Sequence, residues 1–188
     1  ANTREGAFHA PAGDAQVQMM SRTGMMNYAE YQGAQMVEIP YEGERYAMYV
    51  VLPPAGLSPD KMISYVNESL YDHAFSMMTT EKVRLTMPKL KLETEMILNK
   101  TLQYMGIKTA FTSAADFKGI SEMGPLVLDQ VKQKCYIDVS EKGTEAAAVT
   151  SIGVRMTSVR PEIVYTMNVD RPYIFFIADR SNDNILFA

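Results

Sequence analysis

Short apolar runs of strand length recur along this chain, and they constrain its fold more than any other feature. The longest are residues 46–52 and 173–178. Both fall far short of the roughly 20 apolar residues that a helix needs to cross a bilayer, so no membrane span is expected. Runs of this length without alternation predict strands that are buried in a sheet. We therefore expect the core of the protein to be built from packed strands.

Alternation of apolar and polar residues predicts further strands, and turn signals separate several of them. Gly33 and the sequence Tyr41-Glu42-Gly43 mark two turns, so the strands around them should form an antiparallel meander. The predicted strands are residues 15–20, 27–31, 35–39, 45–52, 82–92, 126–139, 162–167, 172–178 and 184–187.

Helical signals are fewer than strand signals. Ser58 can cap a helix that has Pro59 in its first turn, and a second helix is expected over residues 68–78. A third is expected over residues 98–105, where Gly106 is suited to a C-terminal cap. Because predicted strands outnumber predicted helices and the helices are interspersed among them, we expect a compact α+β architecture.

Composition and charge argue against a nucleic-acid partner. Of the 188 residues, 47% are apolar and 21% are charged, which is enough apolar mass for a globular core. The formal net charge is −4, with both signs interspersed. A nucleic-acid surface would need Lys and Arg clustered on one face.

No catalytic or metal-binding motif can be recognised in the sequence. Gly-x-Ser-x-Gly, His-Glu-x-x-His and paired cysteines are all absent, and His9 and His73 lie far apart in the chain. We expect both histidines to be structural or surface residues. Cys135 is the only cysteine, so it has no partner for an internal disulfide. The chain is not expected to be an enzyme or to bind a cofactor or a metal.

Residues 141–161 are unlike the rest of the chain, being too poor in large apolar residues for a core strand and too poor in Gly, Asn and Asp for a turn. Between positions 144 and 156 both charges, Glu145 and Arg155, fall on odd positions. Because side chains alternate along a strand, the segment could enter a sheet without burying a charge. An Ala-rich helix that begins near Thr144 is the alternative. The even positions are Thr144, Ala146, Ala148, Thr150, Ile152, Val154 and Met156.

Several separated motifs resemble one family in the right order. The sequence Glu-Lys-Gly-Thr-Glu-Ala-Ala-Ala-Val-Thr from Glu141 resembles the hinge of an inhibitory serpin's reactive-centre loop, and it follows a Cys-Tyr-Ile-Asp-Val strand at residues 135–139 as in that family. Residues 170–177 and 184–187 are similar to the two closing strands of serpins, and residues 34–53 resemble their central meander. The resemblance implies a serpin fold, with multi-stranded β-sheets and surrounding helices.

The same resemblance implies that residues 1–188 form the C-terminal half of a single serpin domain. A whole serpin is about twice as long, and its main sheet would need strands encoded before Ala1, so the missing N-terminal half is an expected partner. Any targeting segment is expected to lie upstream as well. Gln133 departs from the family, which often carries a His at this place beneath the main sheet, and this could alter the energetics of loop insertion.

The resemblance also implies a function, inhibition of a serine-type endopeptidase by suicide-substrate trapping. In inhibitory serpins the protease attacks the reactive-centre loop and forms an acyl-enzyme, after which the loop inserts into the main sheet. We call residues 141–161, which would be the hinge and reactive-centre loop here, the bait loop. Its hinge residues would be Glu141, Gly143, Thr144, Glu145, Ala146, Ala147 and Ala148.

Two bonds compete as the site of cleavage. The family's spacing places the primary specificity residue fourteen positions after Gly143, at Thr157, so the bond would be Thr157–Ser158. A small Thr suits an elastase-like pocket, whereas a cut after Arg155, before Met156, would suit a trypsin-like protease. The alternative function is that of a non-inhibitory serpin with a carrier, chaperone or storage role. Such members often have a charged or bulky hinge, which this sequence lacks.

A secreted, extracellular protein is expected from the resemblance. Two sequons, at Asn67 and Asn99, would then permit glycosylation.

Overall fold

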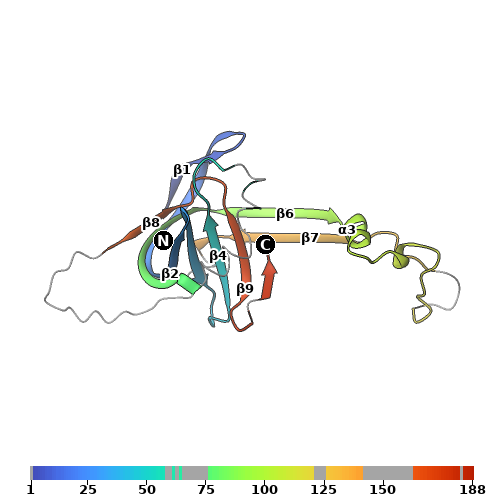
Figure 1. Ribbon diagram of the computed structural model, residues 1–188. Helices are drawn as coiled ribbons and strands as arrows, with labels where there is room; N and C mark the ends of the chain where they lie inside the picture. Colours follow the sequence, from blue (N-terminus) through green and yellow to red (C-terminus); the bar gives the residue numbers. More distant parts are fainter. Residues whose placement is uncertain are drawn as a thin grey trace. The chain divides into compact units, whose positions relative to one another are not determined.

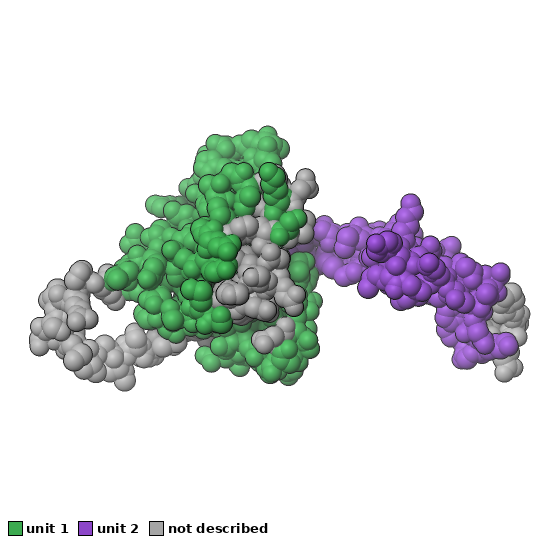
Figure 2. Space-filling view, viewed as in Figure 1, with its two compact units in different colours: residues 1–89, 139–188 green, residues 90–138 purple. Residues whose placement is uncertain are grey.

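The computed structural model describes residues 2–57, 61, 64, 76–120, 126–141, 163–182 and 184–188 (Figure 1). The chain divides into two compact units, which Figure 2 colours separately. Unit 1 comprises residues 1–89 and 139–188, and unit 2 comprises residues 90–138.

Unit 1 is built on one sheet. Its strands follow the order β10-β9-β4-β3-β2-β5-β8, and β1 also pairs with β2. The strands are β1 (Asn2–Ala10), β2 (Gly13–Tyr31), β3 (Ala34–Pro40), β4 (Tyr46–Leu52), β5 (Thr79–Pro88), β8 (Tyr165–Asn168), β9 (Ile174–Asp179) and β10 (Asn184–Phe187).

The predicted antiparallel meander is confirmed, because β2 pairs with β3 and β3 pairs with β4 in antiparallel registers. The sequence predicted two separate strands at 15–20 and 27–31, but β2 is one continuous strand of 19 residues. The polar stretch between them stays in the ladder, since Ser21 to Met26 pair with β5 from Thr86 to Glu81. Tertiary pairing therefore overrides the weak local signal.

The core of unit 1 lies around β4, the strand predicted to be apolar on both faces. Every residue of β4 after Tyr46 is buried. Tyr49 stacks on Phe176 of β9, with ring centroids 5.1 Å apart, and a buried cluster surrounds this pair. The cluster consists of Met36, Ala47, Tyr49, Val51, Phe176 and Ala178.

A buried carboxylate on β3, that of Glu38, has three partners. Glu38, only 5% exposed, accepts hydrogen bonds from Asn27 at 2.6 Å and from Tyr49 at 3.2 Å. Arg180, which follows β9, places its Nε 2.6 Å from the carboxylate. A buried charge with several hydrogen-bond partners avoids the large desolvation cost of an isolated one. The ion pair ties the end of β9 to β3.

The single strand predicted over residues 82–92 is wrong, because the structure splits it in two. β5 ends at Pro88, and β6 (Leu90–Ile97) belongs to a different sheet. Proline has no backbone N–H to donate to a ladder, which favours the end of a strand. The N–H of Lys89 donates instead to the carbonyl oxygen of Gln18, at 2.8 Å. Lys89 is thereby fixed at the edge of the β2–β5 ladder.

Unit 2 contains β6 and all of β7 (Lys132–Val139) except its last residue, and these two strands form a two-stranded sheet and run side by side in Figure 1. They are joined by a segment containing α3 (Asn99–Tyr104) and the short 3₁₀ helix η1 (Thr109–Phe111). The predicted helix end is confirmed, since Gly106 has φ +104° just beyond α3, a conformation that glycine tolerates.

The strand predicted over residues 126–139 begins only at Lys132. Its neighbour β6 ends at Ile97, and the N–H of Leu98 donates to the carbonyl oxygen of Val131 as the chain turns into α3. Residues 126–131 therefore have no strand to pair with in the described part of unit 2.

The helices predicted from Ser58 and over residues 68–78 lie largely outside the described residues, although Ser76 and Met77 are helical. No helix within the described ranges is long and apolar enough to span a membrane.

Candidate functional site at the two ends of the bait loop

The carboxylate of Glu141, the first residue of the bait loop, is held by two donors from distant parts of the chain. Thr3 donates its hydroxyl to Oε1, and the Lys89 ammonium lies 2.7 Å from Oε2. These contacts, chiefly the hydrogen bond from Lys89 and then that from Thr3, lower the pKa of Glu141 to about 2. We call Thr3, Lys89 and Glu141 the hinge latch.

Both donors of the hinge latch are fixed by the sheet of unit 1. Thr3 lies on β1 opposite Met20 of β2, and Lys89 is tied to the same strand through Gln18. The latch is not deeply buried, since the side chain of Glu141 is 24% exposed and that of Lys89 is 41% exposed. Ion pairs that are open to solvent contribute little free energy, so the contact between Lys89 and Glu141 is expected to break at small cost.

Shortly after the bait loop, the described chain resumes at Ile163 and enters β8. Ile163, which precedes this strand, is 69% exposed, whereas Met167 and Val169 are fully buried. β8 pairs with β5 in a parallel register, and the N–H of Val169 donates to the carbonyl oxygen of Thr86 at 2.8 Å. β5 therefore holds β8 and leads directly into Lys89 of the hinge latch.

β1 also contacts the chain near both ends. Thr3 is a member of the hinge latch, and the N–H of His9 donates to the carbonyl oxygen of Asp170 at 2.7 Å. β1, and β5 with Lys89 just after it, thus contact both Glu141, where the bait loop begins, and residues 169–170, which follow β8.

Most of the predicted site residues lie outside the described residues. Glu141 is the exception within the predicted hinge. Those outside are Gly143, Thr144, Glu145, Ala146, Ala147, Ala148, Arg155, Met156, Thr157, Ser158 and the sequon residue Asn67.

The second sequon residue, Asn99, has both ends of its side-chain amide engaged. Its Nδ2 donates to the carbonyl oxygen of Asp129 at 2.7 Å, and its Oδ1 accepts from the N–H of Val131 at 2.8 Å. The residue links the start of α3 to the segment before β7. Glycosylation of Asn99 stays a prediction, and a glycan on Nδ2 would have to compete with the bond to Asp129.

His9 and Gln133, which the sequence also singled out, lie at exposed positions. His9 pairs with Asp14 at 2.9 Å across the β1–β2 turn, and this carboxylate raises the pKa of the imidazole. His73 lies outside the described residues. Gln133 is exposed and donates to the Sγ of Cys135 at 3.3 Å. The described residues contain no group of three His, Cys, Asp or Glu that could hold a metal ion.

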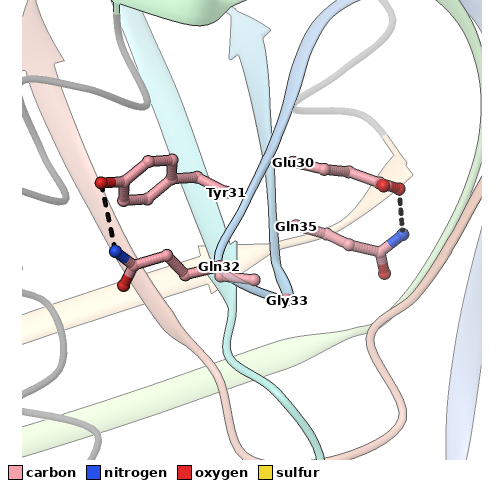
Figure 3. Close-up of a pocket in the computed structure, with 6 residues that line it drawn as sticks. Glu30, Tyr31, Gln32, Gly33 and Gln35 are labelled. Atoms are coloured by element: carbon pink, nitrogen blue, oxygen red, sulfur yellow. Dashed lines mark hydrogen bonds between the residues drawn. The ribbon is translucent and has the colours of Figure 1, made fainter.

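One hollow of about 340 Å³ lies at the β2–β3 turn (Figure 3). It is lined by Glu30, Tyr31, Gln32, Gly33, Ala34 and Gln35. Gln32 and Gly33 form the turn with φ angles of +49° and +82°. Glu30 and Gln35 face each other across the hairpin (Figure 3).

Sequence reasoning proposed Glu141 as a hinge residue, which stays a prediction, and it missed the two partners of the carboxylate. Thr3 lies 138 residues before Glu141 and is one of many polar residues on exposed strand edges. Lys89 falls inside what looked like a continuous strand. Neither carries a local signal of its role, because a contact between distant segments leaves no mark in a single sequence.

Comparison with known proteins identifies the family. The family model for serpins, described as serine protease inhibitors, matches residues 1–188. A serpin-like protein of Thermococcus kodakarensis is 38% identical over 99% of this chain and 43% of its own length. The protein Iris of Ixodes ricinus is 35% identical over 98% of this chain and 50% of its own length.

Solved structures agree with this assignment. The native state of the thermophilic serpin tengpin superposes with a TM-score of 0.77 at 29% identity, covering 98% of this chain and 48% of tengpin. Native protease nexin-1 with heparin gives a TM-score of 0.79 at 26% identity, covering 99% of this chain and 49% of that protein. The chain spans about half the length of the relatives it matches. With these motifs, this fold and a family match over its whole length, the chain belongs to the serpin family.

Proposed function

We propose that the protein of which this chain is part inhibits serine proteases as a suicide substrate, with the bait loop as the segment that is attacked. The observation that carries the proposal is the pair of contacts next to the two ends of the bait loop, the hinge latch at Glu141 and the pairing of β8 with β5 from Tyr165 onward. A bait must be held in place at both ends before it is cut. It must also be free to move at one end afterwards.

The chemistry of the first step belongs to the protease. Its serine oxygen adds to the carbonyl carbon of the specificity residue, the peptide bond breaks, and the new amine on the following residue takes up a proton. The product is an ester between the protease and the bait loop. In this proposal the serpin supplies no catalytic group, only the placement of one peptide bond.

The second step is a conformational one. After cleavage, the segment from Thr144 to Met156 would extend next to β7, the strand that leads into the hinge. Its even-numbered side chains are neutral, so one face can be buried without an unpaired charge. The hinge latch is half-exposed and can open as the hinge moves. The strands that would flank an inserted segment on its other side belong to the proposed N-terminal half.

The specificity residue is proposed to be Thr157, with Arg155 as the rival. The family's spacing from Gly143 favours the Thr157–Ser158 bond and hence an elastase-like protease. Cleavage of the Arg155–Met156 bond would indicate a trypsin-like target. An extracellular setting is proposed on the same family resemblance.

The test is to incubate the full-length protein with an elastase-like and a trypsin-like protease. We expect a complex that survives SDS with one of them, and mass spectrometry should find the cut after Thr157. Arg155→Ala should leave this complex unchanged, whereas Thr157→Arg should transfer it to the trypsin-like protease. Cleavage without any complex would contradict the proposal and favour the non-inhibitory alternative.

A further inference from the structure

The β2–β3 hairpin carries a polar group that reaches the strand after the bait loop. The hydroxyl of Tyr28 donates to Glu30 at 2.5 Å and accepts from Nε2 of Gln35 at 2.7 Å. The same Gln35 nitrogen lies 3.3 Å from Glu30 and 3.0 Å from the carbonyl oxygen of Thr166. Thr166 lies on β8, 131 residues further along the chain. One side-chain amide therefore connects the hairpin to β8.

An aromatic contact supports the same connection. The ring of Tyr165, the first residue of β8, lies 5.1 Å from the ring of Tyr28, at an interplanar angle of 38°. Tyr28 is only 2% exposed, so its position is fixed by the core. Burial, with Glu30 next, raises the pKa of the Tyr28 phenol, so the hydroxyl remains a donor to Glu30 at neutral pH. Tyr165 and Thr166 thus each have a partner on the hairpin.

β8 needs such partners because its own pairing is short. It has four residues and lies at the end of the sheet order, with β5 as its neighbour there. Short edge strands gain little from their ladder and fray readily. Immediately before β8, Ile163 and Val164 are exposed, and the bait loop ends at Pro161. The first residues of β8 are therefore the point at which the bait loop meets the body of the protein.

We propose that Tyr28, Glu30 and Gln35 form a β8 anchor, which positions the carboxyl-side end of the bait loop and thereby selects the bond presented to the protease. The inference rests on the proposed function. Tyr165 lies seven positions after Ser158, with six residues between them, so a shift at Tyr165 would move the near end of the segment that carries the proposed bond. Gln35 is a positioning residue in this proposal, because it acts through β8 and does not touch the protease.

The turn places Gln35 where it can serve as this anchor. Glu30 and Gln35 are register partners in the β2–β3 ladder, so their side chains emerge on the same face of the hairpin. Figure 3 shows the two side chains side by side, joined by the hydrogen bond from the amide to the carboxylate. The amide nitrogen has two N–H bonds, and its shorter contacts are to Tyr28 at 2.7 Å and to Thr166 at 3.0 Å, so the longer contact to Glu30, at 3.3 Å, shares one of these N–H bonds.

The test uses two substitutions of Gln35 in the full-length protein. Gln35→Met keeps the length of the side chain but removes both donors, whereas Gln35→Lys keeps a donor that can reach Glu30 and the Thr166 carbonyl. Gln16→Met is the matched control, since Gln16 is exposed on β2 and its side chain has no hydrogen bond to any described residue. Gln35 lies at the partly exposed end of β3, so these variants should fold.

Two properties of each variant are measured, amide hydrogen exchange in β8 and the reaction with the protease. In Gln35→Met, amide hydrogen exchange in β8 should become about three- to tenfold faster, the range expected for the loss of one ordinary hydrogen bond. The association rate with the protease should fall by a similar factor, and mass spectrometry should find a second bond cut within the bait loop. Gln35→Lys and Gln16→Met should behave like the wild type in both measurements.

The outcomes separate this inference from the proposed function. Unchanged exchange in β8 of Gln35→Met overturns the anchor, even if the protease is trapped normally. If Gln35→Met speeds amide exchange in β8 but leaves both the association rate with the protease and the bond that is cut unchanged, the positioning role is overturned. If the wild type traps no protease, the proposed function fails together with the positioning role, and the exchange experiment still decides whether the contact holds β8.

Discussion

The carboxylate of Glu141 faces an ammonium and a hydroxyl, and this local arrangement has a definite dependence on pH. The contacts with Lys89 and Thr3 lower the pKa of Glu141 from 4.5 to about 2 in the folded protein. A carboxyl group whose pKa is lower in the folded state stabilises that state above its unfolded pKa. The contribution is then lost as the pH falls toward the folded value.

We expect Glu141→Gln to destabilise the protein by an amount that depends on pH. The part of the difference in free energy of unfolding that comes from the charge should be constant above about pH 5, shrink as the pH falls from 4.5 through about 2, and vanish only below that value. Chemical denaturation across this pH range measures it. Glu5→Gln is the control on β1, because Glu5 is exposed and has no ion-pair partner among the described residues. A difference that does not vary with pH would mean that the charge of Glu141 is not what holds the hinge.

At the scale of single elements, the β2–β3 hairpin depends on a glycine for two separable reasons. Gly33 has φ +82°, which is costly for any residue with a Cβ. A Cβ at this position would also lie 3.3 Å from Cγ of Pro54. Gly43, in the β3–β4 turn, has a similar φ of +78°, but a Cβ added there would meet no atom within 4 Å.

Gly33→Ala should therefore cost more than Gly43→Ala. The backbone strain alone should lower the free energy of unfolding by about 1–2 kcal/mol in each variant. Gly33→Ala should lose more because of Pro54, and it should also shift Gln35 and speed exchange in β8. Thermal unfolding and amide exchange measure the two effects. Equal losses in both variants would show that Pro54 moves aside without cost.

The elements also show which parts of the fold can be predicted from a single sequence. β4 was predictable because its uninterrupted apolar run requires burial on both faces, and all but its first residue are buried. The boundary between β5 and β6 was not, because residues 82–92 alternate without a break while the sheet to which they pair changes at Lys89. The predicted start of β7 was wrong for the same reason, because a strand can pair only as far as its partner strand extends. Pairing between distant segments decides such boundaries, and local periodicity does not record it.

At the scale of the whole molecule, the sequence predicts the bait loop because its composition is unusual, but it does not predict the contacts next to the ends of that segment. Neutral even positions and an Ala-rich hinge distinguish residues 141–161 in the sequence itself. The hinge latch and the β8 anchor consist of ordinary residues such as Thr3 and Gln35. Their roles arise only when the sheet brings β1, β3 and β5 to the two ends of the loop.

The proposed trap makes its sharpest prediction about which face of the inserted loop is buried. An arginine on that face would have to leave water without a partner, at a cost of several kcal/mol. Thr144→Arg should therefore slow insertion, so that the protease escapes and most of the serpin is recovered cleaved and uncomplexed. Ala147→Arg places the same charge at an odd position and should leave trapping nearly intact. Densitometry of SDS-stable complex against cleaved serpin gives the partition for both variants. If the two variants trap the protease equally well, the alternation of faces does not govern insertion, and the conformational trap would have to be abandoned.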